Sequence, residues 1–415
     1  MNRAFTICTK SYIGLANSLK QSFLKYNENF EFVIILVDDE KEKIEGCISA
    51  DEILNNYFST KEITNLKFKY NVTEYSTFIK PYAFKYLFDL DSSDLVVYLD
   101  PDIMFFSRFN EIYDENYLAY ITPHHTGMRS KEHMLEEANT LKHGVYNCGF
   151  IAFRKSNDSM NFISWWMERL FDGAYEDLRL GLYTDQIWVD FLPVHLFGNV
   201  LIIKNKGCNI APWNYSERKL IIENDKYYVG DREDCDDVLQ PLCFAHFSGF
   251  DYLKLQQKVV SHKFNDFDKY SDLKDIFNDY GELLRANNAA DFLKGKYIYS
   301  FFTNGMPITK FHRRIFRELS LKIDLGNPFD SNNDFYKILK KSHLLSKDKL
   351  NEPNTFNVSK MGRKYKFLIL FYKMVFKILR VDKYCEFIKA LHKYSVYEEQ
   401  IFLVKAKGLN EKDCV

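Results

Sequence analysis

The sequence lacks several features that would mark a membrane or secreted protein. It contains no run of about 18 uncharged apolar residues, so we expect no membrane-spanning helix. Its first residues do not combine a basic segment with an apolar run, so we expect no secretory signal peptide. The eight cysteines are scattered and form no Cys-x-x-Cys pair, which predicts reduced thiols in a cytoplasmic protein and argues against a zinc site.

Signature motifs of several enzyme classes are also missing. The sequence has no Gly-x-Gly-x-x-Gly after an expected strand, no Gly-x-x-x-x-Gly-Lys-Ser/Thr, no His-Glu-x-x-His and no Gly-x-Ser-x-Gly. Dehydrogenase, P-loop and esterase chemistries therefore lose their main sequence support.

Charge is nearly balanced over the whole chain, at −1, but it is divided unevenly. From Ser331 to Val415 there are 18 Lys and Arg against 9 Asp and Glu, a net charge of +9, which leaves −10 for the preceding 330 residues. An acidic body argues against nucleic acid as the main partner. The basic tail predicts contact with an anionic surface.

Apolar runs alternate with helical patterns over about the first 250 residues. Ala4–Cys8 and Phe32–Val37 have the composition of buried strands, and Leu15–Tyr26 between them has helical spacing. A strand, helix and strand at this spacing form a βαβ unit with parallel strands. The expected fold is α/β, with an open, mostly parallel sheet flanked by helices and a helical C-terminal extension.

The expected boundaries follow from changes in these patterns. Further strands are expected at Leu95–Leu99, Tyr117–Ile121, Val200–Ile203 and Leu242–Phe247, with a turn and then a strand in Val145–Arg154. Further helices are expected at Asn161–Phe171, Thr184–Phe191 and Lys80–Leu90, the last with Pro81 in its first turn. We expect a catalytic domain at 1–260, a helical extension at 261–350 and a basic helical segment at 351–415, with a polar linker at Asn351–Asn357.

The strongest chemical signal is Asp100-Pro101-Asp102, directly after the apolar run Leu95–Leu99. Extended residues two apart point to the same side, and two carboxylates so close repel unless a cation lies between them. Oxygen ligands of this kind favour Mg²⁺ or Mn²⁺. The alternative is a plain turn at the end of a strand, since Asp and Pro are common turn residues.

The segment resembles the DxD region of GT-A-fold glycosyltransferases, and more narrowly of the family 8-type retaining enzymes of bacterial surface-polysaccharide synthesis. Other segments between residues 1 and about 260 resemble motifs of that family in the same order: Lys80-Pro81, Asn147-Cys148-Gly149 (an Asn-x-Gly turn before a strand), Asp185-Gln186, Asn209–Asn214 and His246-Phe247-Ser248-Gly249. One departure is Tyr252, which stands where the family has a lysine that grips the donor diphosphate. Lys254, two residues later, is the candidate substitute.

The resemblance implies a role for each matched residue. It implies Asp100, Asp102 and His246 as ligands of Mn²⁺ or Mg²⁺, Asp185 and Gln186 as catalytic residues beside the donor sugar, and Thr9, Tyr12, Lys80, Asn147 and Lys254 as contacts of the nucleotide-sugar donor. Two alternatives stay open: His246 as a hydrogen-bonded core histidine, and Asp185 as a helix cap next to Thr184.

A basic stripe marks the helical pattern of Tyr365–Arg380. Lys366, Lys373, Lys377 and Arg380 share one face, and apolar side chains fill the rest. Such a helix suits the interface of an anionic membrane. The alternative is a helix packed on the catalytic domain or on a second copy.

Taken together, the residues and the resemblance predict a metal-dependent hexosyltransferase. It would move a hexose from a nucleotide diphosphate sugar, with uridine as the expected nucleoside, to a glycan or lipid-linked acceptor with retention of configuration. It would work in the cytoplasm, at the inner face of the plasma membrane. A non-catalytic nucleotide-sugar-binding scaffold and a sugar nucleotidyltransferase, which would release pyrophosphate, are the alternatives.

Overall fold

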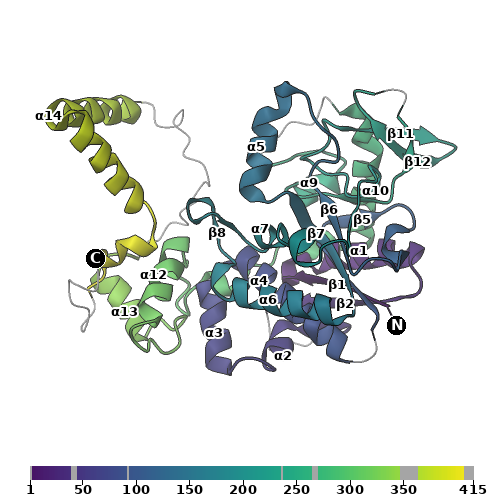
Figure 1. Cartoon of the computed structure of the whole chain (residues 1–415). Helices are drawn as coiled ribbons and strands as arrows, with labels where there is room; N and C mark the ends of the chain where they lie inside the picture. The colour runs from purple at the N-terminus through teal and green to yellow at the C-terminus, as the bar shows by residue number, and fades with distance from the viewer. Residues whose placement is uncertain are drawn as a thin grey trace. The chain divides into compact units, whose positions relative to one another are not determined.

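The computed structural model of the chain describes residues 2–38, 44–90, 93–234, 237–263, 270–345 and 363–405. The chain divides into two compact units (Figure 1). The first unit consists of Met1–Ser59 and Val72–Ile298, and the second of Thr60–Asn71 and Tyr299–Val415. The second unit is therefore assembled from two stretches of chain separated by residues 72–298.

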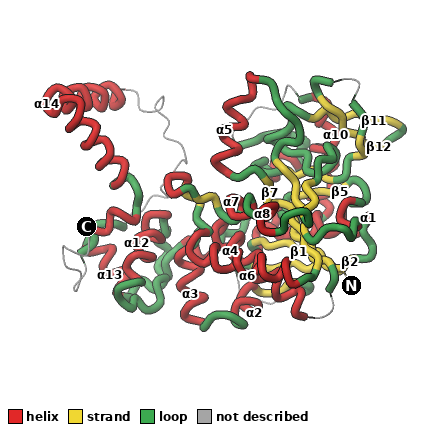
Figure 2. Tube along the Cα trace, viewed as in Figure 1, coloured by secondary structure: helices red, strands yellow, loops and turns green. Residues whose placement is uncertain are grey.

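The first unit is built on a seven-stranded sheet with the strand order β10-β6-β7-β4-β1-β2-β3. Figure 2 draws the strands in yellow. Its strands are β1 (Asn2–Cys8), β2 (Phe30–Leu36), β3 (Cys47–Ser49), β4 (Leu95–Leu99), β6 (Ala119–Pro123), β7 (Tyr146–Arg154) and β10 (Val200–Ile202). Neighbours pair in parallel, except that β7 runs antiparallel to both β4 and β6. The expectation of an open, mostly parallel sheet is confirmed.

Helices cover both faces of this sheet, because successive side chains of a strand point to opposite faces. Ala4 of β1 belongs to the core that includes Phe23 of α1, whereas its neighbour Phe5 packs edge-to-face on Phe84 of α4, at 4.9 Å between ring centroids. The helices of this unit are α1 (Ile13–Tyr26), α2 (Ala50–Leu54), α4 (Val72–Leu90), α5 (Met134–His143), α6 (Asn157–Gly173), α7 (Gln186–Val189), α8 (Leu192–His195), α9 (Tyr252–Leu255), α10 (Lys274–Ala286) and α11 (Ala289–Phe292).

Short strands outside the main sheet complete the first unit. They are β5 (Ile103–Phe105), β8 (Glu176–Asp177), β9 (Leu182–Tyr183), β11 (Arg218–Glu223), β12 (Lys226–Asp231), β13 (Gln240–Pro241) and β14 (Phe244–His246). The antiparallel pair β5–β14 sets His246 opposite Ile103, the residue that follows Asp102. This register brings the histidine to the turn that carries the two aspartates.

Two local expectations were wrong. Pro81 does not lie in a first turn, because α4 begins at Val72 and the proline lies inside the helix. An internal proline lacks the N–H that a helix needs, and the buried side chains of Phe78 and Tyr82 on either side supply packing that offsets this loss.

Asn147-Cys148-Gly149 was expected to form a turn before a strand, and instead it lies within β7. The strand stays continuous because its register with β6 shifts between Ile121, which faces Ile151, and Thr122, which faces Asn147. A β-bulge thus absorbs the residues that the sequence suggested as a turn.

The second unit is helical, as expected for the C-terminal region. It contains α3 (Thr60–Lys69), α12 (Lys310–Ser320), α13 (Asp334–Lys341), α14 (Arg363–Lys393) and a 3₁₀ turn at Glu398–Leu403. Phe68 of α3 contacts the rings of Phe302, Phe316, Phe329 and Phe335, with centroids 4.8 to 5.9 Å apart. An aromatic cluster of this kind supplies most of the apolar area that a small core can bury.

Helix α14 is the least packed element of the second unit. Its helical backbone is interrupted at Arg380, which has φ 62° and ψ 178°. None of its side chains from Tyr365 to Lys393 is buried. Among the described residues, no helix is both long and apolar enough to cross a membrane. The expected linker Asn351–Asn357 lies outside the described residues.

Candidate metal-binding site

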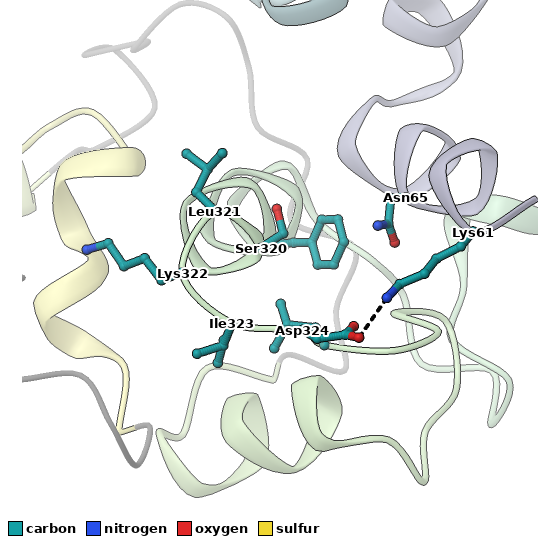
Figure 3. Close-up of a pocket in the computed structure, with 9 residues that line it drawn as sticks. Lys61, Asn65, Ser320, Leu321, Lys322, Ile323 and Asp324 are labelled. Atoms are coloured by element: carbon teal, nitrogen blue, oxygen red, sulfur yellow. Dashed lines mark hydrogen bonds and ion pairs between the residues drawn. The ribbon is translucent and has the colours of Figure 1, made fainter. Parts of the chain in front are cut away.

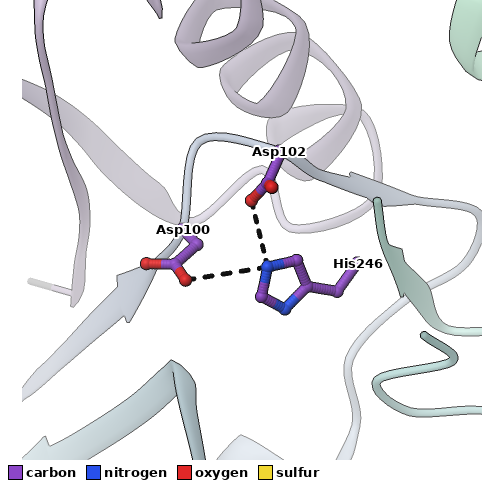
Figure 4. Close-up of side chains that lie close together, drawn as sticks. All are labelled: Asp100, Asp102 and His246. Atoms are coloured by element: carbon purple, nitrogen blue, oxygen red, sulfur yellow. Dashed lines mark ion pairs between the residues drawn. The ribbon is translucent and has the colours of Figure 1, made fainter. Parts of the chain in front are cut away.

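Three side chains converge where β4 ends. Asp100 and Asp102 flank Pro101 in the turn after this strand, and His246 reaches them from β14 (Figure 4). His246 Nε2 lies 3.0 Å from Asp102 Oδ1 and 3.6 Å from Asp100 Oδ2. One ligand atom from each residue lies within 4.8 Å of the others, and no second cluster of this kind occurs in the part of the chain that the structure describes. Ligands about 2.1 Å from one ion are about 3 Å apart at adjacent octahedral positions, so this set fits Mg²⁺ or Mn²⁺.

The orientation of the His246 ring is fixed by a contact of its Nδ1, on the side away from the carboxylates. Its Nδ1 lies 3.3 Å from Asn147 Oδ1, which also accepts a hydrogen bond from Asn209 Nδ2 at 3.2 Å. Because the amide oxygen can only accept, Nδ1 carries a proton, and in the neutral ring the lone pair of Nε2 would be available to a cation held between the carboxylates. The ring lies so close to β7 that only glycine fits at position 149, where an added Cβ would lie 2.4 Å from Cε1 of His246.

A tyrosine phenol contacts each carboxylate. Tyr98 Oη donates a hydrogen bond to Asp100 Oδ1 at 2.5 Å, and Tyr252 Oη donates one to Asp102 Oδ2 at 2.8 Å. Tyr98 lies two residues before Asp100 on the same face of the chain, as an extended backbone requires. Tyr252 stands where the family has a lysine. It is a neutral donor of a hydrogen bond to Asp102, a candidate metal ligand.

Burial and charge act against each other in this cluster. Burial disfavours the charged form of Asp102, but His246 and the hydrogen bond from Tyr252 hold the pKa of its carboxyl below the usual value. Burial likewise disfavours a charged His246, and the charge of Asp102 raises the pKa of the imidazole. The pKa values of Tyr98 and Tyr252 are raised by burial and by the neighbouring aspartates, so both phenols remain donors.

Lys80 joins Asp185 to this cluster. Its Nζ lies 2.7 Å from Asp185 Oδ2 and 3.9 Å from Asp100 Oδ1, and it donates a hydrogen bond to the carbonyl of Cys148 at 2.9 Å. The side chains of Lys80 and Asp185 are each only 3% exposed. Burial disfavours the ammonium, but the two carboxylates raise the pKa of Lys80. Lys80 and Asp185, for which the resemblance implies a donor contact and a catalytic residue, thus form a buried ion pair with each other.

Asp185 and Gln186 stand at the start of α7, which is shorter than the expected helix Thr184–Phe191. Thr184 precedes them with a φ of 50°, outside the helical range. Asp185 occupies the N-cap position without a side-chain capping bond, so the alternative of a simple cap is not supported. The Gln186 amide donates to the His143 carbonyl at 2.7 Å and accepts from the Cys148 N–H at 3.3 Å.

The remaining predicted donor contacts divide into two groups. Thr9 directly follows β1, and the ring of Tyr12 packs edge-to-face on Tyr252 with centroids 5.9 Å apart, which brings Tyr12 to the cluster. Burial and the charge of Asp102 raise the pKa of Tyr12 to about 12. Lys254 is exposed, and its Nζ contacts Ser261 and Asp251, so the structure does not bring it to the cluster.

Several residues of the site were not singled out by the sequence. Tyr98 was noted only as part of an apolar strand, and Tyr252 only as a departure from the family pattern. Trp213 lies in the noted segment Asn209–Asn214, and its ring contacts both His246 and His124 edge-to-face at 5.2 Å. Burial lowers the pKa of His124 to about 4, so this second imidazole is neutral.

Two hollows of the molecule lie apart from the three candidate ligands. One, of about 330 Å³ in the second unit, is lined by Phe316 and by the exposed ion pair of Lys61 with Asp324 (Figure 3). The other, of about 640 Å³ in the first unit, lies between α1, the residues after Ile103 and the β11–β12 hairpin. None of the three candidate ligands lines either hollow.

Sequence comparison finds relatives of unassigned function. No protein-family model matches the chain. The uncharacterized protein YfnF of Bacillus subtilis (strain 168) is 22% identical over 266 residues, which cover 62% of this chain and 84% of that protein. The uncharacterized protein YfnD of the same strain is 24% identical over 255 residues, covering 59% of this chain and 76% of that protein.

Comparison with solved structures finds distant likenesses. The structure of the galactosyltransferase LgtC with donor and acceptor sugar analogues has a TM-score of 0.37 at 13% identity, covering 68% of this chain and 95% of that one. The glycosyltransferase GlyE of Streptococcus pneumoniae TIGR4 has a TM-score of 0.38 at 12% identity, covering 72% of this chain and 66% of that one. These scores are too low to support a function.

Proposed function

We propose that the chain is a divalent-metal-dependent glycosyltransferase. It transfers a hexose from a nucleotide diphosphate sugar, with uridine as the nucleoside, to a glycan or lipid-linked acceptor and retains the anomeric configuration. The catalytic part is the sequence-defined region 1–260. Asp100, Asp102 and His246 would hold a Mn²⁺ or Mg²⁺ ion, which would supply positive charge to the diphosphate leaving group.

One observation carries this proposal. Asp100, Asp102 and His246 present three ligand atoms to one point beyond the carboxyl ends of parallel strands, where open α/β sheets bind their ligands. A set of two carboxylates and one imidazole leaves coordination positions free for phosphate oxygens. Contacts of Lys80 with Asp100 and Asp185, and of Asn147 with His246, support a single site for these motifs.

The surrounding residues support a donor site next to the ion. Asp185 binds hydroxyls of the donor sugar and Gln186 lies near the anomeric carbon, while Tyr12 packs on the nucleotide base beside Thr9. Asn147 acts by holding His246, with which it is in contact. The carboxylates of Asp100, Asp102 and Asp185 are each engaged by His246, Lys80 or a phenol. None stands free as a general base, which favours retention over inversion.

The test is a screen of nucleotide diphosphate sugars with the purified full-length chain. We expect release of a nucleoside diphosphate that depends on Mn²⁺ or Mg²⁺. Addition of a mixture of candidate glycan acceptors should increase this release. Release of pyrophosphate from a sugar phosphate and a nucleoside triphosphate would identify a nucleotidyltransferase instead. If the chain binds a nucleotide sugar in a metal-dependent way but transfers its sugar to no acceptor, it is a binding scaffold.

We further propose that α14 holds the enzyme at an anionic membrane surface. Phe367, Leu370, Met374 and Ile378 are 54 to 73% exposed, and Lys366, Lys373 and Lys377 lie on one side of the same helix. A helix with an apolar majority and a basic stripe matches an anionic lipid interface in both polarity and charge. The same stripe would repel a second copy of itself, which disfavours pairing of this helix between two chains.

A further inference from the structure

The two aspartates of the candidate metal site each use their two oxygens differently. Asp100 Oδ2 and Asp102 Oδ1 face His246 Nε2, at 3.6 and 3.0 Å. The opposite oxygens accept hydrogen bonds from the phenols of Tyr98 and Tyr252. We propose that Tyr98 and Tyr252 are positioning residues, which hold the two carboxylates with one oxygen each turned toward a divalent cation. This inference rests on the proposed metal-dependent function.

The argument begins with the freedom of an aspartate side chain. The carboxylate of Asp102 can rotate about its last bond, and only some orientations direct Oδ1 toward the point that Asp100 and His246 also face. Its side chain is 13% exposed, so water can satisfy the second oxygen only in part. The phenol of Tyr252 supplies that missing partner and makes one orientation the most stable.

Charge explains why a phenol serves better than a basic side chain at this position. A phenol donates a hydrogen bond and remains neutral, so it does not repel a divalent cation bound to the same carboxylate. An ammonium at position 252 would compete with the cation for Asp102. The nearest ammonium, that of Lys80, is 3.9 Å from Asp100 and already lies 2.7 Å from Asp185.

The chain path makes Tyr252 part of one short clamp around Asp102. His246 and Tyr252 lie six residues apart in the sequence, and each contacts a different oxygen of the Asp102 carboxylate. Between them, the N–H of Phe247 donates to the Asp102 backbone carbonyl at 2.9 Å. One segment thus supplies the third ligand and also orients the second.

The test compares metal affinity in single variants of the full-length chain. Tyr252→Phe and Tyr98→Phe remove one hydroxyl each and keep the ring. We expect each to weaken Mn²⁺ binding roughly 10- to 100-fold, as loss of an outer hydrogen bond to a ligand typically does. Free Mn²⁺ in a titration is measured by electron paramagnetic resonance, so the result does not depend on catalysis.

Tyr280→Phe is the matched control. Tyr280 is fully buried with its ring centroid 6.4 Å from that of Tyr252, and its hydroxyl has no hydrogen-bond partner among the described residues. This variant should bind Mn²⁺ as the wild type does. A purely structural role for the phenols would instead lower the melting temperature of Tyr252→Phe and Tyr98→Phe and leave their Mn²⁺ affinity unchanged.

The outcomes separate this inference from the proposed function. If the wild type binds Mn²⁺ and both phenylalanine variants bind it within twofold as tightly, the positioning role is overturned and the metal site stands. If the wild type binds neither Mn²⁺ nor Mg²⁺, the metal site is overturned and the positioning role with it. If one variant fails to fold, the other still decides, because each phenol serves a different aspartate.

Discussion

Gly149 lies against the imidazole of His246 so closely that a methyl group at its Cα would lie 2.4 Å from Cε1 and 2.7 Å from Nδ1 of the ring. Heavy atoms do not approach to these distances, so the ring would have to move. Its hydrogen bond to Asn147 and its approach to Asp102 depend on the present position. This contact makes Gly149 a sensitive probe of the candidate site.

Gly149→Ala is therefore expected to cost about 1–3 kcal/mol of folding free energy and to weaken Mn²⁺ binding more than 10-fold. Urea denaturation and a Mn²⁺ titration measure the two effects. Gly127→Ala is the control, because an added Cβ at that position has no atom within 4 Å. Equal metal affinity in both variants would show that His246 is a core histidine and not a ligand.

Asp102→Asn keeps the shape of the side chain and removes its charge. We expect Mn²⁺ affinity to fall more than about 100-fold and turnover to fall with it, while the melting temperature changes little. Asp100→Asn should behave in the same way. Asp291→Asn, at an exposed position of the same unit, serves as the control. Near-wild-type turnover of Asp102→Asn with Mn²⁺ would contradict the assignment of the ligands.

Lys80→Met leaves the buried carboxylate of Asp185 without its cation. Breaking one side of a buried pair typically costs about 3–5 kcal/mol, and we expect urea denaturation to show a loss of this size. The double variant Lys80→Met with Asp185→Asn should be more stable than the single one, because no lone charge is left. Lys85→Met on the same helix, where the lysine pairs with exposed Asp89, should change stability by less than about 0.5 kcal/mol.

The carboxyl group of Glu217 should make the stability of the first unit depend on pH. Burial opposes its charge, but His125, Arg218 and Thr126 together lower the pKa of its carboxyl to about 2 from an ordinary value of 4.5. Since the folded pKa is the lower one, the stabilisation is fully present above about pH 4.5 and is lost as the pH falls toward 2. A shift of this size corresponds to roughly 3 kcal/mol.

The acid prediction is checked by urea denaturation between pH 7 and pH 3. Wild-type stability should fall steeply across the acid part of this range. Glu217→Gln should be less stable at pH 7 and should lose less of its stability on acidification. Glu223→Gln, at an exposed position of β11, provides the comparison. Parallel acid profiles for the wild type and Glu217→Gln would rule out this origin of the pH dependence.

The proposed binding of α14 to an anionic membrane is better tested by substitutions in this helix than by deletion of the C-terminal segment. Removing every residue from Asn351 would also remove Glu398, which lies 3.2 Å from the buried guanidinium of Arg314, and Ile401 of the core. The triple variant Lys366→Glu, Lys373→Glu, Lys377→Glu should reduce binding to phosphatidylglycerol vesicles on the order of 100-fold, at about 1 kcal/mol for each lysine lost. Sedimentation of the protein with the vesicles measures this loss of binding.

The matched control reverses the same number of charges on α13, at the exposed Lys337, Lys340 and Lys341. It should leave binding nearly unchanged. High salt should release part of the wild-type protein, because the Debye length shrinks to about 3 Å at 1 M. Equal binding to neutral vesicles, or equal losses in both triple variants, would exclude an anionic surface as the partner of α14.

Strands buried on both faces were predictable from the sequence, and so were helices with one buried apolar face, such as α1 and α6. Ala4–Cys8 was recognisable as a strand because it is an apolar run interrupted only by Thr6, and all five of its residues are buried. Helix α5 was missed, and its apolar side chains Met134, Leu135 and Leu141 remain exposed, so no packed face marks it. The β11–β12 hairpin had a usable signal in Asn224-Asp225, which adopt the positive φ angles of 50° and 59° that a tight hairpin turn requires.

The candidate site was predictable in its ligands and not in their supports. Asp100 and Asp102 stand two residues apart and directly follow a strand, so a local pattern indicated them, whereas His246 was indicated by the family resemblance. The hydrogen bond from Tyr252 to Asp102 spans 150 residues, and no local pattern indicates it. The pairing of Lys80 with Asp185 also depends on the packing of α4 against the sheet. Long-range contacts of this kind follow from the tertiary fold alone.

The discontinuity of the second unit has a consequence for biosynthesis. Phe68 leaves the ribosome before the whole of residues 72–298, yet its ring partners Phe302, Phe316, Phe329 and Phe335 lie beyond them. At a synthesis rate of about 5–20 residues per second, the apolar face of α3 stays without these partners for roughly 10 to 50 s. A nascent chain that stalls in this interval presents a hydrophobic segment to chaperones and proteases, and release of the complete C-terminal helices ends that exposure.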